Sequence, residues 1–272
     1  MSRLGFHIPF GKPYHNAIEA FHISCSAMQV FIGSPKTYKR PIVDPSDPAI
    51  VRVREYVQRN NIFLVEHSPY IYNLANKLED NQKVLEAVVQ DIKNVVAMGG
   101  VGTVVHVGKH LKRDKAECMT NMYLSMKYAI ENTEEGFFIL ETPAGCGTEL
   151  CCTTEELATL YDFFTEEEKK RVKLCVDTCH IYASGYDVSS PKEYIDKFEE
   201  LIGWNNVAVC HYNNSKGTCG CKVDRHENIS QGCISQDGMK EFAREMHRRN
   251  IPLILETPNA NEELDYVRSF FY

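Results

Sequence analysis

The sequence predicts an α/β fold, a single (β/α)8 barrel in which eight parallel strands are each followed by a helix. Three observations favour this architecture. Short runs rich in β-branched and aromatic residues alternate with longer amphipathic stretches, a pattern typical of parallel sheets built from βα units. There are eight such runs, as a closed barrel of this type requires, although an open sheet is the alternative. The 272 residues are enough for one such domain, which we expect to span residues 1–272.

Signals for helices and strands alternate along the chain. Asp47 precedes Pro48, so a capping side chain followed by a first-turn proline predicts a helix start. A second helix is expected to open at Asp80 and end at Gly99, because valine and isoleucine recur at helical spacing between them. The capping boxes that predict two later starts are Thr153-x-x-Glu156 and Ser190-x-x-Glu193. The expected strands are Arg3–Ile8, Met28–Ile32, Ile62–His67, Thr103–His106, Phe137–Glu141, Lys173–Asp177, Val207–His211 and Pro252–Glu256.

The composition is that of a soluble globular protein, with 43% hydrophobic and 25% charged residues. No apolar run approaches the ~20 residues that span a bilayer. The first ten residues also lack the apolar core and the cleavage site of a secretory signal. We therefore expect an intracellular protein of the cytoplasm or nucleus, with no membrane partner. The net charge of −7 argues against a nucleic-acid partner unless divalent cations offset it at the site.

The 11 cysteines are scattered along the chain, which is typical of a reducing compartment. Cys146 lies close in sequence to Cys151 and Cys152 in one expected loop, so a local disulfide between Cys146 and either of them stays open. Cys219-x-Cys221 resembles half of a zinc–thiolate site, but no second cysteine pair has matching spacing.

One apolar run after another stops at a side chain that can bind a metal ion. In a (β/α)8 barrel the carboxyl ends of the strands converge on one face, so these side chains would meet in one pocket. A lone histidine at a strand end is usually a packing residue. Many carboxylates and imidazoles crowded together without a cation would be costly to desolvate, which favours bound metal. The strand-end residues are His7, His67, His106, Glu141, Asp177, His211 and Glu256.

Two further ligand pairs follow the later strands, Asp177-x-x-His180 and Asp224-x-His226. Imidazole nitrogen mixed with carboxylate oxygen suits Zn²⁺, with Mn²⁺ as second choice. The candidate ligands are too many for one tetrahedral ion and indicate two or three ions. These nine residues are His67, His106, Glu141, Asp177, His180, His211, Asp224, His226 and Glu256.

Three motifs carry a resemblance to a known family. They are LCVDTCH at 174–180, HYNNSKGTCGCKVDRH at 211–226 and HSPYIYNLA at 67–75. On these, the chain resembles the endonuclease IV family, the zinc-dependent apurinic/apyrimidinic endonucleases of family 2, over almost its whole length. The chain departs from the family pattern at four places: Asn214 for an acidic residue, Tyr72 for a small or aliphatic one, Val107 for a proline and Gly11-Lys12 for a Gly-Gly pair. None of these departures removes an expected ligand, although Asn214 would alter hydrogen bonds around the ligands.

The resemblance implies a DNA repair enzyme on a TIM barrel, acting as a monomer on duplex DNA with abasic sites. It would hydrolyse the phosphodiester bond 5′ to the abasic site and leave a 3′-hydroxyl, with trimming of 3′ ends as a further activity. It implies about three Zn²⁺ per chain, with Mn²⁺ as a substitute. His67 and His106 would hold the first ion, and Glu141, the catalytic residue, would bridge it to the second. Asp177, His211 and Glu256 would complete the second, and His180, Asp224 and His226 would hold the third.

The resemblance also implies that Tyr70 inserts into DNA from which the abasic nucleotide has been flipped out. Lys36 stands where the family usually has arginine. It would insert into the DNA in the same way, but less well, because lysine lacks a planar stacking group. Packing on the barrel rim is the alternative for Tyr70. Residues that receive an ordinary surface or packing interpretation are the pairs Lys39-Arg40 and Lys112-Arg113, which could also touch phosphates, and His15, His22 and His247.

Two other functions stay open on the sequence. A sugar isomerase or epimerase on a similar barrel would use one or two metals and would not need His180, Asp224 and His226. A DNA-lesion binding protein without catalysis would lack a bridging ligand, yet Glu141 and Glu256 are both present.

Overall fold

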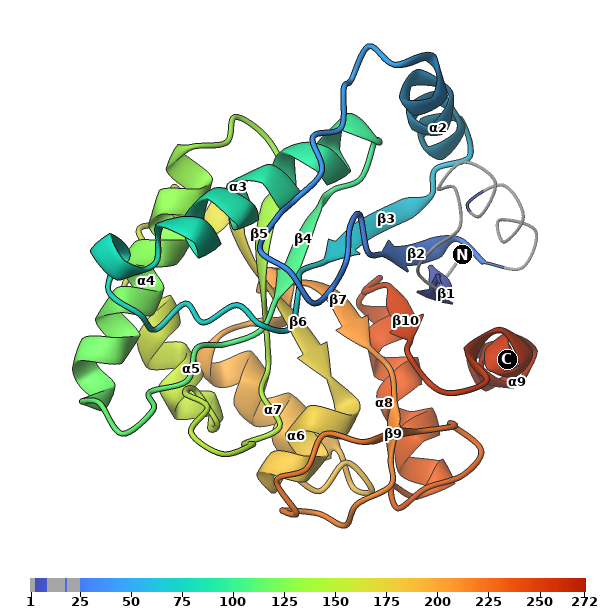
Figure 1. Ribbon diagram of the computed structural model, residues 1–272. Helices are drawn as coiled ribbons and strands as arrows, with labels where there is room; N and C mark the ends of the chain where they lie inside the picture. The colour runs from blue at the N-terminus through green and yellow to red at the C-terminus, as the bar shows by residue number, and fades with distance from the viewer. Residues whose placement is uncertain (1–2, 9–17, 19–24) are drawn as a thin grey trace.

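The computed structural model describes residues 3–8, 18 and 25–272 of the chain. Its centre is a closed barrel of parallel strands in the order β1-β10-β7-β6-β5-β4-β3-β2 (Figure 1), which confirms the predicted fold class. Gly11, Lys12, His15 and His22 lie outside the described residues. The strands are β1 (Leu4–His7), β2 (Ala27–Val30), β3 (Phe63–His67), β4 (Gly102–Val105), β5 (Phe137–Glu141), β6 (Val172–Asp177), β7 (Val207–His211) and β10 (Leu253–Leu255).

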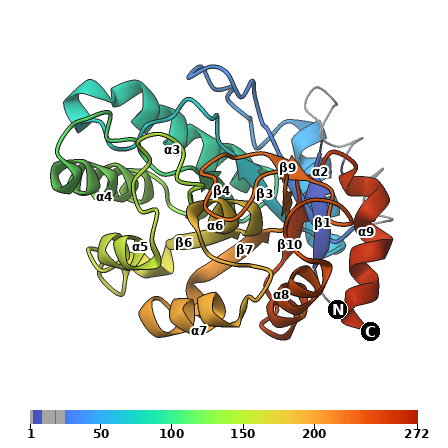
Figure 2. The same ribbon diagram turned by 90° about the horizontal axis from the view of Figure 1, so that it is seen from below.

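Helices surround the barrel in both views, and α9 lies beside β1 (Figures 1 and 2). The α-helices are α2 (Pro48–Arg59), α3 (Gln82–Ala97), α4 (Lys115–Glu131), α5 (Thr154–Tyr161), α6 (Thr178–Ser184), α7 (Lys192–Leu201), α8 (Gln236–Arg248) and α9 (Ala260–Arg268). Short 3-10 turns are η1 (Leu78–Asp80), η2 (Glu168–Lys170), η3 (Trp204–Asn206) and η4 (Ser269–Phe271). A small antiparallel pair, β8 (Asn214–Ser215) with β9 (His226–Glu227), closes the long loop after β7.

Two of the expected helix starts are confirmed by their caps. The Asp47 carboxylate accepts a hydrogen bond from the Ala49 N–H, and Pro48 opens α2. The Thr153 hydroxyl accepts from the Glu156 N–H at the start of α5. Each bond satisfies one of the backbone donors that a helix start leaves unpaired. In a capping box the Glu156 carboxylate would accept from the N–H of Thr153. Here it accepts instead from the N–H of the preceding residue, Cys152, at 2.9 Å.

The other two expected starts are wrong. Asp80 ends the 3-10 turn η1, and α3 begins two residues later at Gln82. α7 begins at Lys192 after Pro191, and no described side chain caps it. The Ser190 N–H instead donates to the Asp187 carbonyl, so Ser190 belongs to the preceding turn. Gly99 does follow the end of α3, with a φ of 85° that favours glycine.

Alternation along the strands divides the buried residues into two clusters. The larger joins the outward faces of the strands to the helices, and α8 adds to it through its apolar side. His247 of α8 stacks on Phe271 at a ring distance of 4.8 Å, a packing role as expected. The smaller contains no helix residue and fills the barrel interior. Its buried members are Ala27, Phe63, Val65, Val104, Ile139, Cys175, Val209 and Ile254.

In the described part of the chain, no helix has the length and apolar character needed to cross a membrane. The thiols of Cys146, Cys151 and Cys152 are free, so the local disulfide left open by the sequence is not formed.

Candidate metal centre

Six of the candidate ligands form the last layer of the barrel interior. Successive side chains of a strand point to opposite faces, so residues two positions apart share a face. Val65 fills the interior, and His67 follows it on the same face of β3. The same step leads from an interior apolar residue to His106, Glu141, Asp177, His211 and Glu256. This spacing explains why residues from separate strands meet at the carboxyl end of the barrel.

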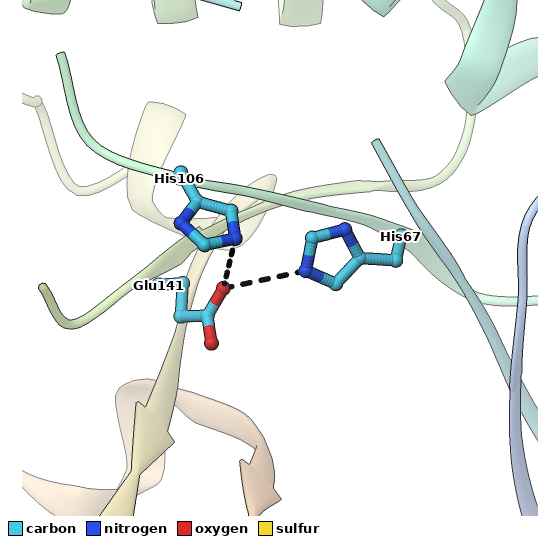
Figure 3. A group of neighbouring side chains, drawn as sticks. All are labelled: His67, His106 and Glu141. Atoms are coloured by element: carbon cyan, nitrogen blue, oxygen red, sulfur yellow. Dashed lines mark ion pairs between the residues drawn. The ribbon is translucent and has the colours of Figure 1, made fainter. Parts of the chain in front are cut away.

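His67, His106 and Glu141 make the first group (Figure 3). Both imidazoles turn Nε2 toward one carboxylate oxygen, Glu141 Oε2, at 3.5 Å from His67 and 3.3 Å from His106. The Nδ1 of His67 lies 2.7 Å from the Ser68 carbonyl, which can only accept a hydrogen bond. His67 therefore keeps its proton on Nδ1 when neutral and presents the Nε2 lone pair to the centre of the group.

Glu141, Asp177, His211 and Glu256 make the second group. His211 Nδ1 lies 2.8 Å from Glu141 Oε1, 3.2 Å from Glu256 Oε2 and 3.9 Å from Asp177 Oδ2. The two Glu141 oxygens therefore face different groups, Oε2 the first and Oε1 the second. This geometry allows one carboxylate to bridge two cations.

His180, Asp224 and His226 make the third group. Asp224 Oδ1 lies 3.3 Å from His180 Nε2 and 3.2 Å from His226 Nε2. His180 Nδ1 is held at 2.8 Å by the Thr142 carbonyl, which leaves Nε2 for a cation. Asp177 connects this group to the second, because its Oδ2 lies 3.6 Å from His226 Nε2 while its Oδ1 caps the His180 N–H.

The donor atoms of these groups fit metal ions. Glu141 Oε2, His180 Nε2 and His226 Nε2 are buried and have no hydrogen-bond partner among the described residues. A buried polar atom without a partner carries a desolvation cost that a cation would remove. Nitrogen and carboxylate oxygen donors within 4.8 Å of one another are a set suited to Zn²⁺.

Electrostatics keeps the carboxylates of Glu141 and Asp224 and the imidazole of His106 in the state that metal binding needs. Burial by itself would raise the pKa of Glu141, yet the imidazoles of His106 and His211 hold it well below its usual range. Burial lowers the pKa of His106 to about 4, so this imidazole is neutral near pH 7. Burial opposes ionisation of Asp224, but the nearby imidazoles of His180 and His226 lower the pKa of this carboxyl. Against the opposing effect of burial, nearby acidic groups raise the pKa of three other imidazoles, to about 9 for His226 and well above the usual value for His180 and His211. Ionised carboxylates and a neutral imidazole are ready to bind a cation.

Two thiols adjoin the second and third groups. Burial raises the pKa of Cys175 to about 11 and that of Cys179 to about 12. Both thiols are therefore neutral near pH 7, and the thiolate is the form that binds metals. The histidines and carboxylates remain the better ligands here.

The groups open into a cavity of about 410 Å³. Tyr70 lines this cavity with 58% of its surface exposed, and its ring packs against Phe31 at 5.6 Å and His67 at 5.4 Å. Tyr70 therefore packs on the rim and also presents a free aromatic face. Lys36 is exposed in the segment between β2 and α2, and it is not among the described residues that line the cavity.

The surface interpretation of the Lys39-Arg40 pair is wrong for Arg40. Its guanidinium is buried and pairs with Asp91 of α3 and, at 2.8 Å, with Glu66 of β3. The hydroxyl of Tyr72 donates to Asp91 at 2.8 Å, which gives this departure from the family pattern a structural role. The network holds the segment after β2 against the loop that carries Tyr70, whereas Lys39 stays exposed. In the other pair, Arg113 donates to the carbonyls of His110 and Lys109.

Replacing Arg40 by methionine is expected to lower the free energy of unfolding by about 3–5 kcal/mol, because Glu66 and Asp91 would lose their buried cation. Urea unfolding of the two proteins measures the difference. Lys39→Met is the matched control and is expected to stay within about 0.5 kcal/mol of the parent protein. A loss below about 1 kcal/mol for Arg40→Met would show that the network contributes little.

The structure corrects the interpretation of Asn214. Its amide nitrogen donates to the carbonyls of Ile229 and Ile234, and its oxygen accepts from the Ser215 and Ile234 N–H groups. These partners are loop backbone and not metal ligands. An ionised acid at this position could not donate, so the amide suits this loop.

Three site residues were missed by the sequence argument or left without a role. Asn213 donates to Asp177 Oδ2 at 2.7 Å and accepts from the Glu256 N–H at 2.8 Å. His7 and Gln29 contact each other, and Gln29 also contacts Glu256. Gln29 could have been found from its position two residues after Ala27, the same step that leads to each strand-end ligand.

Comparison with known proteins shows the family of the chain. A family model described as xylose isomerase-like TIM barrel matches residues 19–270. The chain is 33% identical over 266 residues to an apurinic-apyrimidinic endonuclease of Caenorhabditis elegans, covering 94% of this chain and 66% of that protein. It is 31% identical to a "probable endonuclease 4" of Methanosphaera stadtmanae, covering 100% of both chains. The crystal structure of endonuclease IV from Thermus thermophilus superposes with a TM-score of 0.83 at 28% identity, covering 99% of this chain and 97% of the other. The chain therefore belongs to the endonuclease 4 family of xylose isomerase-like TIM barrels.

Proposed function

We propose that this chain, as one domain over residues 1–272, is a DNA repair endonuclease that cuts duplex DNA 5′ to abasic sites and leaves a 3′-hydroxyl. The observation that carries the proposal is the set of three ligand groups linked through Glu141 and Asp177 beneath an open cavity. Relatives that match the whole chain bear endonuclease 4 names, and the relative from C. elegans is named for abasic sites. Trimming of 3′ ends belongs to the same proposal, because it is also phosphodiester hydrolysis.

The centre would hold about three Zn²⁺, with Mn²⁺ as a substitute. When bound, such ions lower the pKa of water and neutralise charge that builds up on the phosphate. His67 and His106 would hold the first ion, and Glu141 would bridge it to the second. Asp177, His211 and Glu256 would complete the second site, and His180, Asp224 and His226 would hold the third ion.

Substrate binding uses groups outside the ligand set. Tyr70, exposed at the cavity mouth, fills the space that a flipped-out nucleotide leaves in the duplex. Lys36 contacts the phosphate backbone from the exposed segment between β2 and α2.

The protein acts on DNA as a monomer. The three cations offset part of the net charge of −7 where DNA approaches.

The experiment that tests the proposal uses zinc-loaded protein and a duplex oligonucleotide with one abasic analogue. The expected result is a single incision on the 5′ side, with a product that a polymerase extends because its 3′ end is a hydroxyl. A matched duplex without the analogue stays uncut. Zinc-loaded protein that leaves the abasic duplex intact, or cuts both duplexes equally, contradicts the proposal.

Replacing Tyr70 by alanine is expected to weaken binding to abasic duplex about 5- to 150-fold, because base–aromatic stacking contributes ~1–3 kcal/mol. Binding to intact duplex is expected to change far less. Fluorescence anisotropy with both duplexes measures the effect. Tyr272→Ala, which removes a 97% exposed ring from the end of the chain, is the control. Equal losses on the two duplexes would leave Tyr70 as a rim residue only.

A further inference from the structure

Gln29 of β2 is completely buried beneath the second ligand group. Its side-chain amide contacts three residues of the site. Oε1 lies 2.8 Å from His211 Nε2, while Nε2 lies 2.7 Å from Glu256 Oε1 and 2.8 Å from His7 Nδ1. One amide on β2 therefore contacts residues at the carboxyl ends of three other strands, β1, β7 and β10, where the candidate ligands converge.

The chemistry of Glu256 settles which way this amide points. A carboxylate that binds a cation is ionised, so both oxygens of Glu256 only accept hydrogen bonds, and Oε1 lies 2.7 Å from the amide nitrogen of Gln29. The amide nitrogen of Gln29 must therefore face Glu256, and the amide oxygen must face His211. The second N–H of the amide then donates to His7 Nδ1.

The proton of neutral His211 follows from this orientation. An amide oxygen only accepts, so His211 Nε2 carries a hydrogen and donates it to Gln29. The other ring nitrogen, Nδ1, is then free of hydrogen. That nitrogen faces Glu141 Oε1 and Glu256 Oε2, which would be ligands of the second ion.

We propose that Gln29 is a positioning residue of the metal centre: its amide holds His211 with Nδ1 toward the second ion and orients the Glu256 carboxylate toward the same ion. The inference rests on the proposed function, because it concerns the metal centre of that site. Hydrogen-bond partners of this kind orient metal ligands, and their loss typically lowers metal affinity 10- to 100-fold. A residue that only filled the core would be replaceable by an apolar side chain of similar size.

The test replaces Gln29 by methionine, which keeps the size and removes every hydrogen bond, and measures zinc retention against a chromogenic chelator. One ion per chain is expected to leave Gln29→Met at a free-zinc concentration 10- to 100-fold higher than in the parent protein. Gln90→Met, on α3 away from the cavity, is the matched control and is expected to keep the parent retention curve. Retention within 2-fold of the parent protein for Gln29→Met would overturn the proposal.

A second measurement needs no variant and covers the case in which Gln29→Met does not fold. Long-range ¹H–¹⁵N NMR correlations of the zinc-loaded parent protein report which nitrogen of His211 carries hydrogen. The expected result is a protected Nε2–H with Nδ1 bound to metal. A hydrogen on Nδ1 would overturn the proposal directly.

Neither readout depends on DNA cleavage, so the two proposals fail in different ways. Weakened zinc retention in a protein that does not cut abasic DNA leaves Gln29 as a positioning residue and removes the proposed function. If the parent protein cuts abasic DNA but Gln29→Met retains zinc as the parent protein does, the proposed function stands and Gln29 is not a positioning residue. A parent protein that binds no zinc would overturn both.

Discussion

Replacing Glu141 by glutamine is expected to lower the rate of abasic-site cleavage at least ~100-fold, while affinity for abasic DNA changes less than ~10-fold. The carboxylate turns Oε2 to His67 and His106 and Oε1 to His211. Glutamine has the same size, but one of its two terminal atoms is an NH₂ group that cannot bind a cation. One ligand group would thus lose its shared oxygen, and the centre would lose one negative charge. DNA affinity is largely kept because phosphate and stacking contacts lie elsewhere.

Single-turnover cleavage and a binding titration on the same preparation measure this split. Glu200→Gln makes the same chemical change on the exposed side of α7 and is expected to cut at the parent rate. A Glu141→Gln protein with nearly the parent rate would remove Glu141 from the mechanism. That result would reopen the interpretation as a sugar isomerase or epimerase.

Removing the metal ions is expected to abolish cleavage and to lower the free energy of unfolding by several kcal/mol. A ligand that binds only the folded state stabilises it by about 4 kcal/mol at 1,000 times its dissociation constant. The cations would also be the natural partners of buried atoms such as Glu141 Oε2 and His180 Nε2, which have no hydrogen-bond partner among the described residues. Without cations those atoms stay desolvated and unpaired.

Elemental analysis before and after dialysis against a chelator gives the metal content, and about three Zn²⁺ per chain are expected at the start. Thermal unfolding and cleavage are then followed as zinc is added back, and both are expected to recover together. Adding Mn²⁺ in place of zinc in the same experiment tests the site with a second metal. One ion or none after zinc supplementation, or cleavage that survives full removal of metal, would contradict the three-ion centre.

The sequence alone was sufficient to predict the barrel and its ligand face. Each strand is a short apolar run, and its signal is local, since alternation places Val65 and His67 on one face whatever the rest of the chain does. All eight expected strands form, with ends within about two residues of the prediction. Convergence of the six candidate ligands at strand ends then follows from barrel closure, because parallel strands bring their carboxyl ends together. His180 of α6 and Asp224 and His226 of the loop after β7 complete the set from outside the barrel strands.

Only the tertiary structure decided the residues whose partners are distant in the chain. Gln29 meets His211 and Glu256, which lie 182 and 227 positions away, and no local pattern encodes such pairs. Arg40 looked like a surface cation beside Lys39, because a buried guanidinium is recognisable only once its carboxylate partners have been placed around it. Periodicity and capping signals act within a few residues and thus determine elements and faces. Burial and pairing of polar groups depend on which elements pack together, and that is settled only when the barrel closes.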